Sequence, residues 1–249
     1  MFNQNPFDLG RSPAREQGST PATYGYAAGA GAGTLAVPRE GYLTAAFVWM
    51  FLALLVSAAT AAMTVASEGA LAAVLDWWWF LLIGEFALVI VLSAAINRMN
   101  STVAVLMLFV YAALTGATLS VIVASFTVAS VASAFLGASA IFGAAALYGA
   151  VTGRDLTSLG GLLFAGLMGI IVASLVNIFI GGTTLSFVIG IAGVLLFTGL
   201  TAWDVQRIKN GRLTWVRNAQ NASVVAALSL YLDFINLFLM LLRVFGQQR

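Results

Sequence analysis

The chain has 249 residues, of which 61% are hydrophobic and 8% are charged, and its formal net charge is +2. Soluble domains are usually about 45–50% apolar and about 25% charged. The composition therefore excludes an ordinary soluble globule, a disordered protein and a nucleic-acid binder, and it indicates a polytopic membrane protein. The chain contains neither Cys nor His, which excludes disulfides, thiolate chemistry and His-dependent catalysis. Any proton chemistry must rest on carboxylates.

Residues 1–38 differ in composition from the rest of the chain. They contain all four prolines, and Gly, Ala and Thr are frequent among them. Such a composition cannot form a packed core, so we expect a flexible tail. The segment also lacks the apolar stretch of a cleavable signal peptide. The sequence thus predicts a tail over residues 1–38 and a membrane domain over residues 39–249.

Within the predicted membrane domain, long apolar runs alternate with short polar segments. A helix that crosses a hydrocarbon core about 30 Å thick needs about 20 apolar residues. Seven runs meet this requirement, and no proline interrupts them. We therefore predict an all-α fold with seven transmembrane helices over residues 44–66, 77–97, 102–124, 128–150, 160–180, 184–204 and 222–245.

Small residues recur at four-residue spacing in the third and fourth predicted helices. A stripe of this kind lets two helix backbones approach each other closely in lipid. We expect close helix contacts at the pairs Gly116/Ser120, Ser133/Gly137 and Ser139/Gly143.

Basic residues collect on one side of the predicted topology. The tail and the second, fourth and sixth loops carry nine Lys and Arg residues, whereas the first, third and fifth loops carry none. The positive-inside rule then places the N-terminus in the cytosol. The last helix leaves an alternative open. If it spans fully, the C-terminus lies outside, whereas a re-entrant helix returns Arg243 and Arg249 to the cytosol.

Three acidic residues fall within the predicted spans, namely Glu85, Asp204 and Asp233. A carboxylate near the bilayer centre costs at least about 2.5–3.5 kcal/mol, so each is a candidate functional residue. Asp233 has long apolar runs on both sides and shares a narrow polar stripe with Ser229 and Asn236. The alternative interpretation is a carboxyl group that is kept neutral, or one that is tied to a Ser or Asn side chain for packing specificity.

Asp204 ends the sixth predicted span, and the seventh helix returns beside it. Two carboxylates that share a site cannot both ionise cheaply, so they titrate as a coupled pair. In a chain without histidine, Asp204 and Asp233 are therefore the predicted pH sensor. Asp233 lies eleven residues into its predicted helix, or roughly 16 Å. Either the sixth helix continues beyond residue 204, or a water-filled vestibule reaches Asp233.

Arg98 and Glu85 are the other candidates, both in the second predicted span. Arg98 ends this span at the cytosolic level of Asp204, so it is either a salt-bridge partner of an aspartate or a simple interfacial anchor. Glu85 either lines an ion path toward the aspartates or forms a buried hydrogen bond. Because calcium prefers carboxylate oxygens, Asp204, Asp233 and Glu85 are also the candidate calcium ligands.

Two C-terminal stretches, GLTAWDVQRIK (199–209) and LSLYLDFINLFLMLLRVFG (228–246), resemble the Bax inhibitor-1 family. They are similar to the end of its sixth helix and to its central C-terminal helix. FVYAALTGATLS, SAFLGASAIFGAAALYG and TGRDL resemble its third helix, its fourth helix and the following loop, so the resemblance covers about residues 40–246. It implies two three-helix layers around the last helix. It further implies a di-aspartyl sensor at Asp204 and Asp233 with Arg98 as partner, Glu85 as the acidic second-helix residue, and a calcium leak.

The leading functional hypothesis is a pH-sensitive calcium leak channel rather than an enzyme, with no covalently bound cofactor. In this hypothesis, Arg98 and the ionised aspartates close the cytosolic mouth, and protonation shifts the population toward an open state. The expected partners are the lipid bilayer, calcium and protons. Arg outnumbers Lys by ten to one and Ala is abundant, which points to the plasma membrane of a bacterium.

Two other functions remain open from the sequence. One is a non-transporting regulator that binds a membrane protease or another channel. The other is an intramembrane aspartyl protease, which is disfavoured because the second aspartate lies in SLYLD rather than GxGD and no PAL tripeptide occurs.

Overall fold

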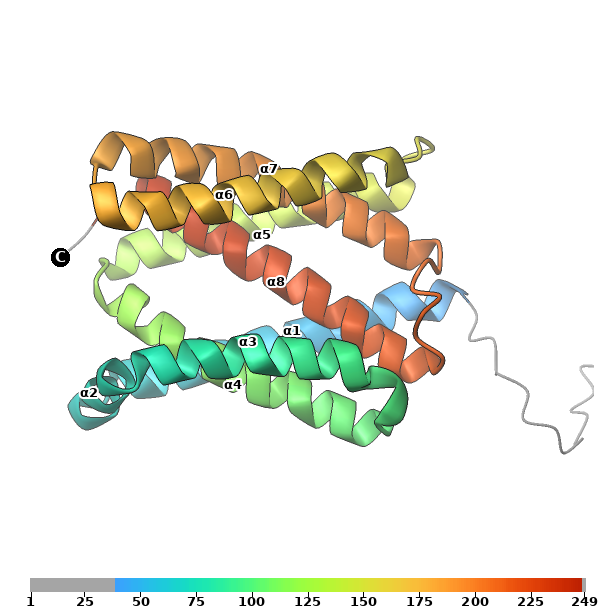
Figure 1. Cartoon of the computed structure of the whole chain (residues 1–249), viewed down its shortest axis with the longest axis horizontal. Helices are drawn as coiled ribbons and strands as arrows, with labels where there is room; N and C mark the ends of the chain where they lie inside the picture. Colours follow the sequence, from blue (N-terminus) through green and yellow to red (C-terminus); the bar gives the residue numbers. More distant parts are fainter. Residues whose placement is uncertain (1–38, 248–249) are drawn as a thin grey trace, which may run out of the picture. The chain divides into compact units, whose positions relative to one another are not determined.

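The structure is a computed structural model that describes residues 39–247. The predicted tail over residues 1–38 lies outside the described residues. Residues 39–247 contain no β-strand and form seven helices long and apolar enough to cross a membrane (Figure 1). The predicted all-α fold with seven spans is therefore confirmed. The seven helices are α1 (Arg39–Val65), α3 (Trp78–Ala95), α4 (Ser101–Ala124), α5 (Val128–Val151), α6 (Gly160–Ile180), α7 (Thr183–Lys209) and α8 (Ala219–Phe245).

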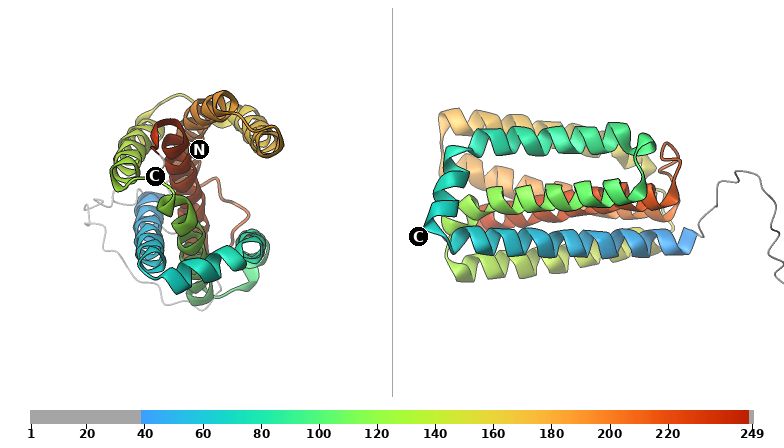
Figure 2. Two further views of the ribbon diagram at one scale, coloured as in Figure 1. Left: turned by 90° about the vertical axis from the view of Figure 1, so that its left-hand side faces the viewer. Right: turned by 90° about the horizontal axis from the view of Figure 1, so that it is seen from below.

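The last helix, α8, lies at the centre of the membrane domain. Helices α1, α3 and α4 form one layer and α5, α6 and α7 form the other, with α8 between them (Figures 1 and 2). Of the 27 residues of α8, 17 are buried, whereas α6 has no buried residue. An all-apolar helix such as α6 suits a lipid-facing position, because lipid tails are as apolar as its side chains. The two-layer arrangement around a central C-terminal helix is confirmed.

Helix α8 crosses the whole domain without a break. Its first residue follows the connection from α7, and its other end lies beside the start of α5. There the Gln247 N–H donates to Ser130 Oγ at 2.9 Å, and the Thr127 N–H donates to the Gln247 carbonyl at 3.0 Å. The re-entrant alternative for the last helix is therefore not the one adopted. Arg243, in the last turn of α8, lies at the end of the bundle opposite the α7–α8 connection.

One connecting segment is more ordered than the sequence prediction allowed. Residues 68–76, expected as part of a polar connection, form the short helix α2 (Glu68–Asp76). Ser67 caps its N-terminus, because its Oγ accepts the Ala70 N–H at 3.3 Å and so satisfies one of the free donors of the first turn. Two short 3₁₀ turns, η1 (Ile96–Arg98) and η2 (Thr157–Leu159), occupy other connections.

Helix α7 continues past the predicted end at residue 204 and stops at Lys209. Gly211, with φ of +65°, ends it. The Gly211 N–H donates to the Ile208 carbonyl at 2.9 Å, and the Arg212 N–H donates to the Arg207 carbonyl at 3.0 Å. This pair of bonds is the Schellman arrangement, which requires a left-handed residue that glycine supplies without strain. The sixth span therefore runs beyond Asp204. This is one of the two alternatives that the different depths of Asp204 and Asp233 left open in the sequence.

The predicted small-residue contacts are formed at Gly116 but not at Gly143. A Cβ atom at Gly116 would collide with the backbone of Ser57 in α1, whereas one at Gly143 would meet open space. Helices α1 and α4 therefore approach each other closely at Gly116. Gly149 of α5 makes a comparable contact with the Ala202 carbonyl of α7, which the sequence analysis missed.

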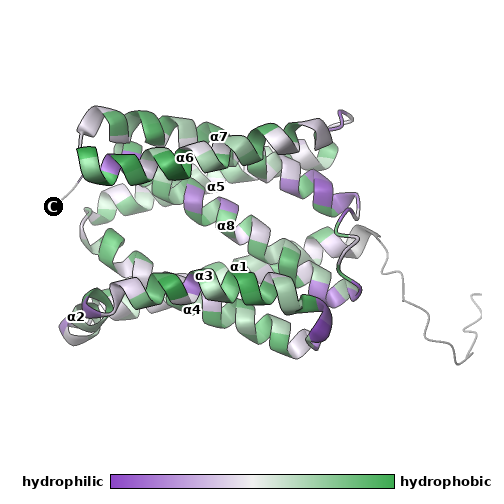
Figure 3. Ribbon diagram, in the orientation of Figure 1, coloured by the Kyte–Doolittle hydropathy of each residue, from purple (hydrophilic) through white to green (hydrophobic). Residues whose placement is uncertain are grey.

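Polar residues are concentrated at one end of the helices, as the hydropathy colouring shows (Figure 3). This end contains the connections from α3 to α4, from α5 to α6 and from α7 to α8. The basic residues Arg98, Arg154, Arg207, Lys209, Arg212 and Arg217 belong to it. We refer to it as the basic end.

Candidate functional site

Asp204 lies on α7 and Asp233 lies on the central helix α8, and these two helices pack against each other. Helices α7 and α8 are antiparallel, with Gly193 against Met240 and Gly190 against Val244. Continued along both helices, this register places Asp204 about one helical turn from Asp233 along the axis. Asp204 is 8% exposed and Asp233 is 6% exposed, and their carboxylates lie close enough to interact through their charges. The structure thus brings the two aspartates together, and we call them the aspartate pair.

Asp233 has no polar partner for one of its oxygens. Its Oδ2 is buried and accepts no hydrogen bond from any described residue. The two polar neighbours on its stripe do not supply one, because the Asn236 amide donates to the Leu232 carbonyl of its own helix at 2.8 Å and Ser229 makes no bond to Asp233. The alternative in which Asp233 is tied to a Ser or Asn is therefore not formed, whereas the alternative of a neutral carboxyl group stays open. A buried unpaired oxygen is rare in native proteins and calls for a functional explanation.

The cation beside the aspartate pair is Arg207, not Arg98. Arg207 Nη1 lies 3.8 Å from Asp204 Oδ1, and its guanidinium group sits 5.0 Å from the centre of the Trp203 ring. Arg98 ends η1 with an exposed side chain and forms no ion pair among the described residues. The predicted Arg98 contact is thus absent. The reason is the longer α7, which places a cation one turn beyond Asp204 on the same helix.

Glu85 lies apart from the aspartate pair. Its Oε1 accepts a hydrogen bond from Thr118 Oγ1 of α4 at 2.6 Å, and its carboxylate is near Tyr231 of α8. The Tyr231 hydroxyl is 2.7 Å from Ser57 Oγ of α1. Because Tyr231 and Asp233 are separated by about 200° around α8, the two groups occupy opposite faces of that helix. We call Glu85, Thr118, Tyr231 and Ser57 the Glu85 cluster.

The separation of Glu85 from the aspartate pair also bears on whether the three candidate calcium ligands can share one ion. Among the described residues, no three Asp, Glu, His or Cys side chains are grouped closely enough to hold a metal ion. Asp204, Asp233 and Glu85 therefore do not form one three-residue group, and their assignment as calcium ligands stays a prediction. The sequence placed all three within predicted spans but could not give the side of α8 on which each would lie.

At the basic end, two side-chain amides bind the backbone of the connecting segments, and the sequence analysis missed both. Gln206 accepts the Leu156 N–H at 2.8 Å and donates to the Arg154 carbonyl at 2.7 Å. Asn97 donates to the Trp215 carbonyl at 2.8 Å and accepts the Arg217 N–H at 2.9 Å. Each amide thus binds the backbone of a connecting segment through both a donor and an acceptor. A lone Gln or Asn in a sequence gives no sign of such a partner.

Within the described residues, six helices that can cross a membrane surround a seventh, which carries a buried carboxyl group with an unpartnered oxygen; this arrangement defines a polytopic membrane protein with an ionisable group in its core. Residues 39–249 match the family model described as inhibitor of apoptosis-promoting Bax1. The chain belongs to the Bax inhibitor-1 family, as its C-terminal stretches indicated.

Curated bacterial proteins share this similarity over most of their length. The inner membrane protein YbhL of Escherichia coli is 42% identical over 222 residues, which cover 85% of this chain and 95% of the relative. An uncharacterized protein of Deinococcus radiodurans is 38% identical over 205 residues, covering 82% of this chain and 89% of the relative. A Rickettsia prowazekii protein is 37% identical over 214 residues, covering 84% and 90%. The two sequences therefore match across the membrane domain in each case.

Proposed function

We propose that this protein is a pH-sensitive calcium leak channel in which Asp204 and Asp233 sense protons. The observation that carries the proposal is the buried carboxylate of Asp233, whose Oδ2 has no partner among the described residues. Keeping such a group inside a membrane domain is expensive, and intramembrane carboxylates usually serve ion or proton movement. A second carboxylate on the neighbouring helix couples the two titrations, because both groups cannot ionise cheaply in one site.

The gate follows from the contacts of Asp204. At neutral pH the ionised Asp204 pairs with Arg207, and the connections bound by Gln206 and Asn97 cover the basic end. Protonation of Asp204 removes the charge that Arg207 pairs with. The population then shifts toward an open state, because the closed state has lost one of its differential contacts. Arg207 takes the role that the sequence analysis gave to Arg98.

The transported ion and the orientation are part of the same proposal. Calcium is supported by the family resemblance and by the preference of this ion for carboxylate oxygens. The basic end faces the cytosol if the chain follows the positive-inside rule, which also places the N-terminus there. The membrane is the plasma membrane of a bacterium, since a similar protein of Escherichia coli bears the name inner membrane protein.

The proposal is tested with the purified full chain in liposomes that contain a trapped calcium-sensitive dye. Calcium influx is measured from about pH 8 to about pH 6, with protein-free liposomes as the control and with sodium and potassium as competing ions. We expect an influx above the control that rises as the pH falls. Folded protein without calcium influx at any pH would overturn the proposal and favour a non-transporting regulator.

A further inference from the structure

A polar cavity of about 260 Å³ opens at the basic end of the second layer. It lies between the last turn of α5, the segment that leads to α6, and the end of α7. It is separate from the aspartate pair and from the Glu85 cluster, neither of which contributes a side chain to it. Its lining includes Gly153, Arg154, Asp155, Gln206, Lys209 and Arg212.

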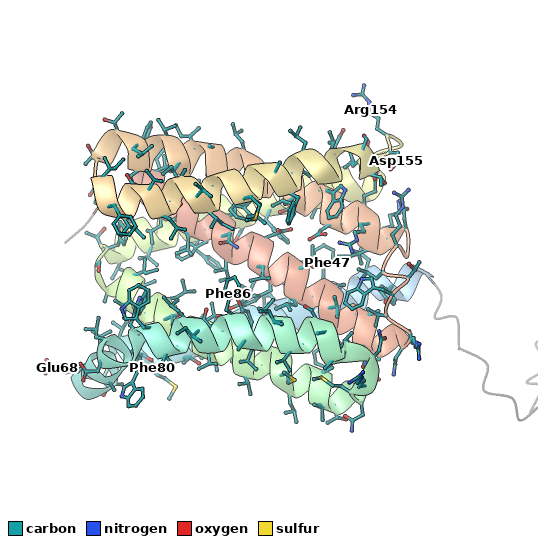
Figure 4. All side chains as sticks on the ribbon, in the orientation of Figure 1. Phe47, Glu68, Phe80, Phe86, Arg154 and Asp155 are labelled. Atoms are coloured by element: carbon teal, nitrogen blue, oxygen red, sulfur yellow. The ribbon has the colours of Figure 1, made fainter. Side chains whose placement is uncertain are left out.

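Positive charge exceeds negative charge in this cavity. Three cationic side chains line it, and the one carboxylate is Asp155, which pairs with Arg212 at 3.3 Å. Hydrogen bonds from the Thr157 hydroxyl and from the Thr157 N–H, with Arg212 beside them, hold the pKa of Asp155 below its usual range. Lys209 donates to the Ala150 carbonyl. The Arg154 side chain forms no ion pair within residues 39–247 and extends away from the helices (Figure 4).

The backbone adds a donor beside these cations. Among the described residues, the Gly153 N–H donates to no acceptor. A Cβ atom at Gly153 would meet nothing within 4 Å, so the space on the side-chain side of this residue is open. Arginine, lysine and backbone N–H donors in the lining of one cavity suit the several acceptor oxygens of a phosphate group.

The position of the cavity along the membrane-crossing helices indicates which kind of phosphate group it would meet. The spans of α5 and α7 end at Val151 and Lys209, and the next span begins at Thr157, so the cavity lies where lipid headgroups lie. Trp203, which lines an adjoining cavity of about 220 Å³ with Arg207 and Arg212, is of the residue type enriched at this level. Lipid phosphate is always present here, whereas free phosphate must arrive from water.

We propose that this cavity binds the phosphate headgroup of an anionic phospholipid through Arg154, Arg212, Lys209 and the Gly153 N–H. Basic pockets between membrane helices on the cytoplasmic side recognise anionic headgroups in this way. Zwitterionic lipids offer the same phosphate with a compensating cation, so they bind more weakly. The occupied leaflet is the one at the basic end.

The test uses the purified full chain in a neutral detergent and measures lipid binding by native mass spectrometry. Short-chain phosphatidylglycerol, phosphatidylcholine and inorganic phosphate are the three probes. We expect tighter binding of phosphatidylglycerol than of phosphatidylcholine. Arg154→Gln should weaken phosphatidylglycerol binding about fivefold, and Arg154→Gln with Arg212→Gln about 25-fold, since each arginine near an anionic surface contributes about 1 kcal/mol.

Arg98→Gln and Arg217→Gln are matched controls, because both remove a cation from the basic end but not from the cavity. They should leave phosphatidylglycerol binding unchanged. Equal binding of the two lipids, or an unchanged phosphatidylglycerol affinity in Arg154→Gln, would overturn the proposal. Displacement of the lipid by inorganic phosphate at comparable concentration would assign the cavity to a soluble anion instead. Because Arg154 is exposed and unpaired among the described residues, the single variant keeps the test valid if the double variant misfolds.

Discussion

The two carboxyl groups on opposite sides of α8 differ in their hydrogen bonding. On the face toward α1 and α4, Glu85 accepts a hydrogen bond from Thr118, and Tyr231 bonds to Ser57. On the face toward α7, Asp233 keeps an oxygen without any partner in the described residues. A satisfied buried polar group specifies packing, whereas an unsatisfied one costs free energy that only a function recovers. The comparison favours a structural role for the Glu85 cluster and supports the proposal that the aspartate pair senses protons.

The largest expected effect concerns the close contact that holds the Glu85 cluster together. Gly116→Leu places a side chain against the Ser57 backbone, so we expect a loss of about 1–3 kcal/mol in stability from overpacking. Unfolding in a detergent titration measures it. Gly143→Leu is the matched control, since Gly143 has no neighbour within 4 Å of a Cβ atom. Equal losses in both variants would contradict the packing at Gly116.

A smaller loss of stability is expected when the hydroxyl group of Tyr231 is removed from the Glu85 cluster. Tyr231→Phe removes the bond to Ser57, and single hydrogen bonds inside membrane proteins contribute about 0.6 kcal/mol on average and at most about 1.7 kcal/mol. We expect a loss within this range in the same titration. Tyr148→Phe, at a tyrosine that is 48% exposed, should change nothing. If Tyr231→Phe also changes nothing, the Glu85 cluster does not stabilise the fold.

On the side of α8 that faces α7, the expected change in stability has the opposite sign. Asp233→Leu replaces an unpaired buried carboxyl group by an apolar side chain of similar size, so we expect stability to be unchanged or raised by about 1 kcal/mol. Thermal unfolding of the purified variant measures the change. A loss as large as that of Tyr231→Phe would mean that Asp233 has a stabilising partner.

The smallest expected effect distinguishes the two candidate cations. Without Arg207, the ionised form of Asp204 loses a favourable partner, so calcium influx in Arg207→Gln should rise at a higher pH than in the wild type. A partly exposed ion pair contributes about 0.2–1 kcal/mol, which corresponds to a shift of less than about 1 pH unit. Arg98→Gln should leave the profile in place. The reverse result would return the role to Arg98.

Much of the fold follows from composition, because an apolar run of membrane-crossing length has few other uses. The residues at which the helices end do not follow from composition. Whether α7 stops at residue 204 or at Lys209 depends on the bonds around Gly211, which no hydropathy pattern records. That difference of about one turn and a half placed Arg207 beside Asp204 and left Arg98 unpaired among the described residues.

The candidate site was predictable to the extent that its residues are rare in their surroundings. Asp233 stands out because a carboxylate inside a long apolar run is costly. Glu85 was equally conspicuous, but its hydrogen bond to Thr118 depends on the rotation of α3 against α4. Gln206 and Asn97 bind backbone groups of distant connections, so their roles arise only when the helices are assembled.

The central claim is that the aspartate pair, and not the Glu85 cluster, senses protons. The most direct test compares the pH dependence of calcium influx in liposomes that contain wild type, Asp233→Asn or Glu85→Gln. We predict that influx varies with pH in the same way in the wild type and in Glu85→Gln, whereas in Asp233→Asn, where Asp204 titrates without its neighbouring carboxylate, influx begins to rise at a lower pH. A pH dependence in Asp233→Asn equal to that of the wild type would contradict the claim.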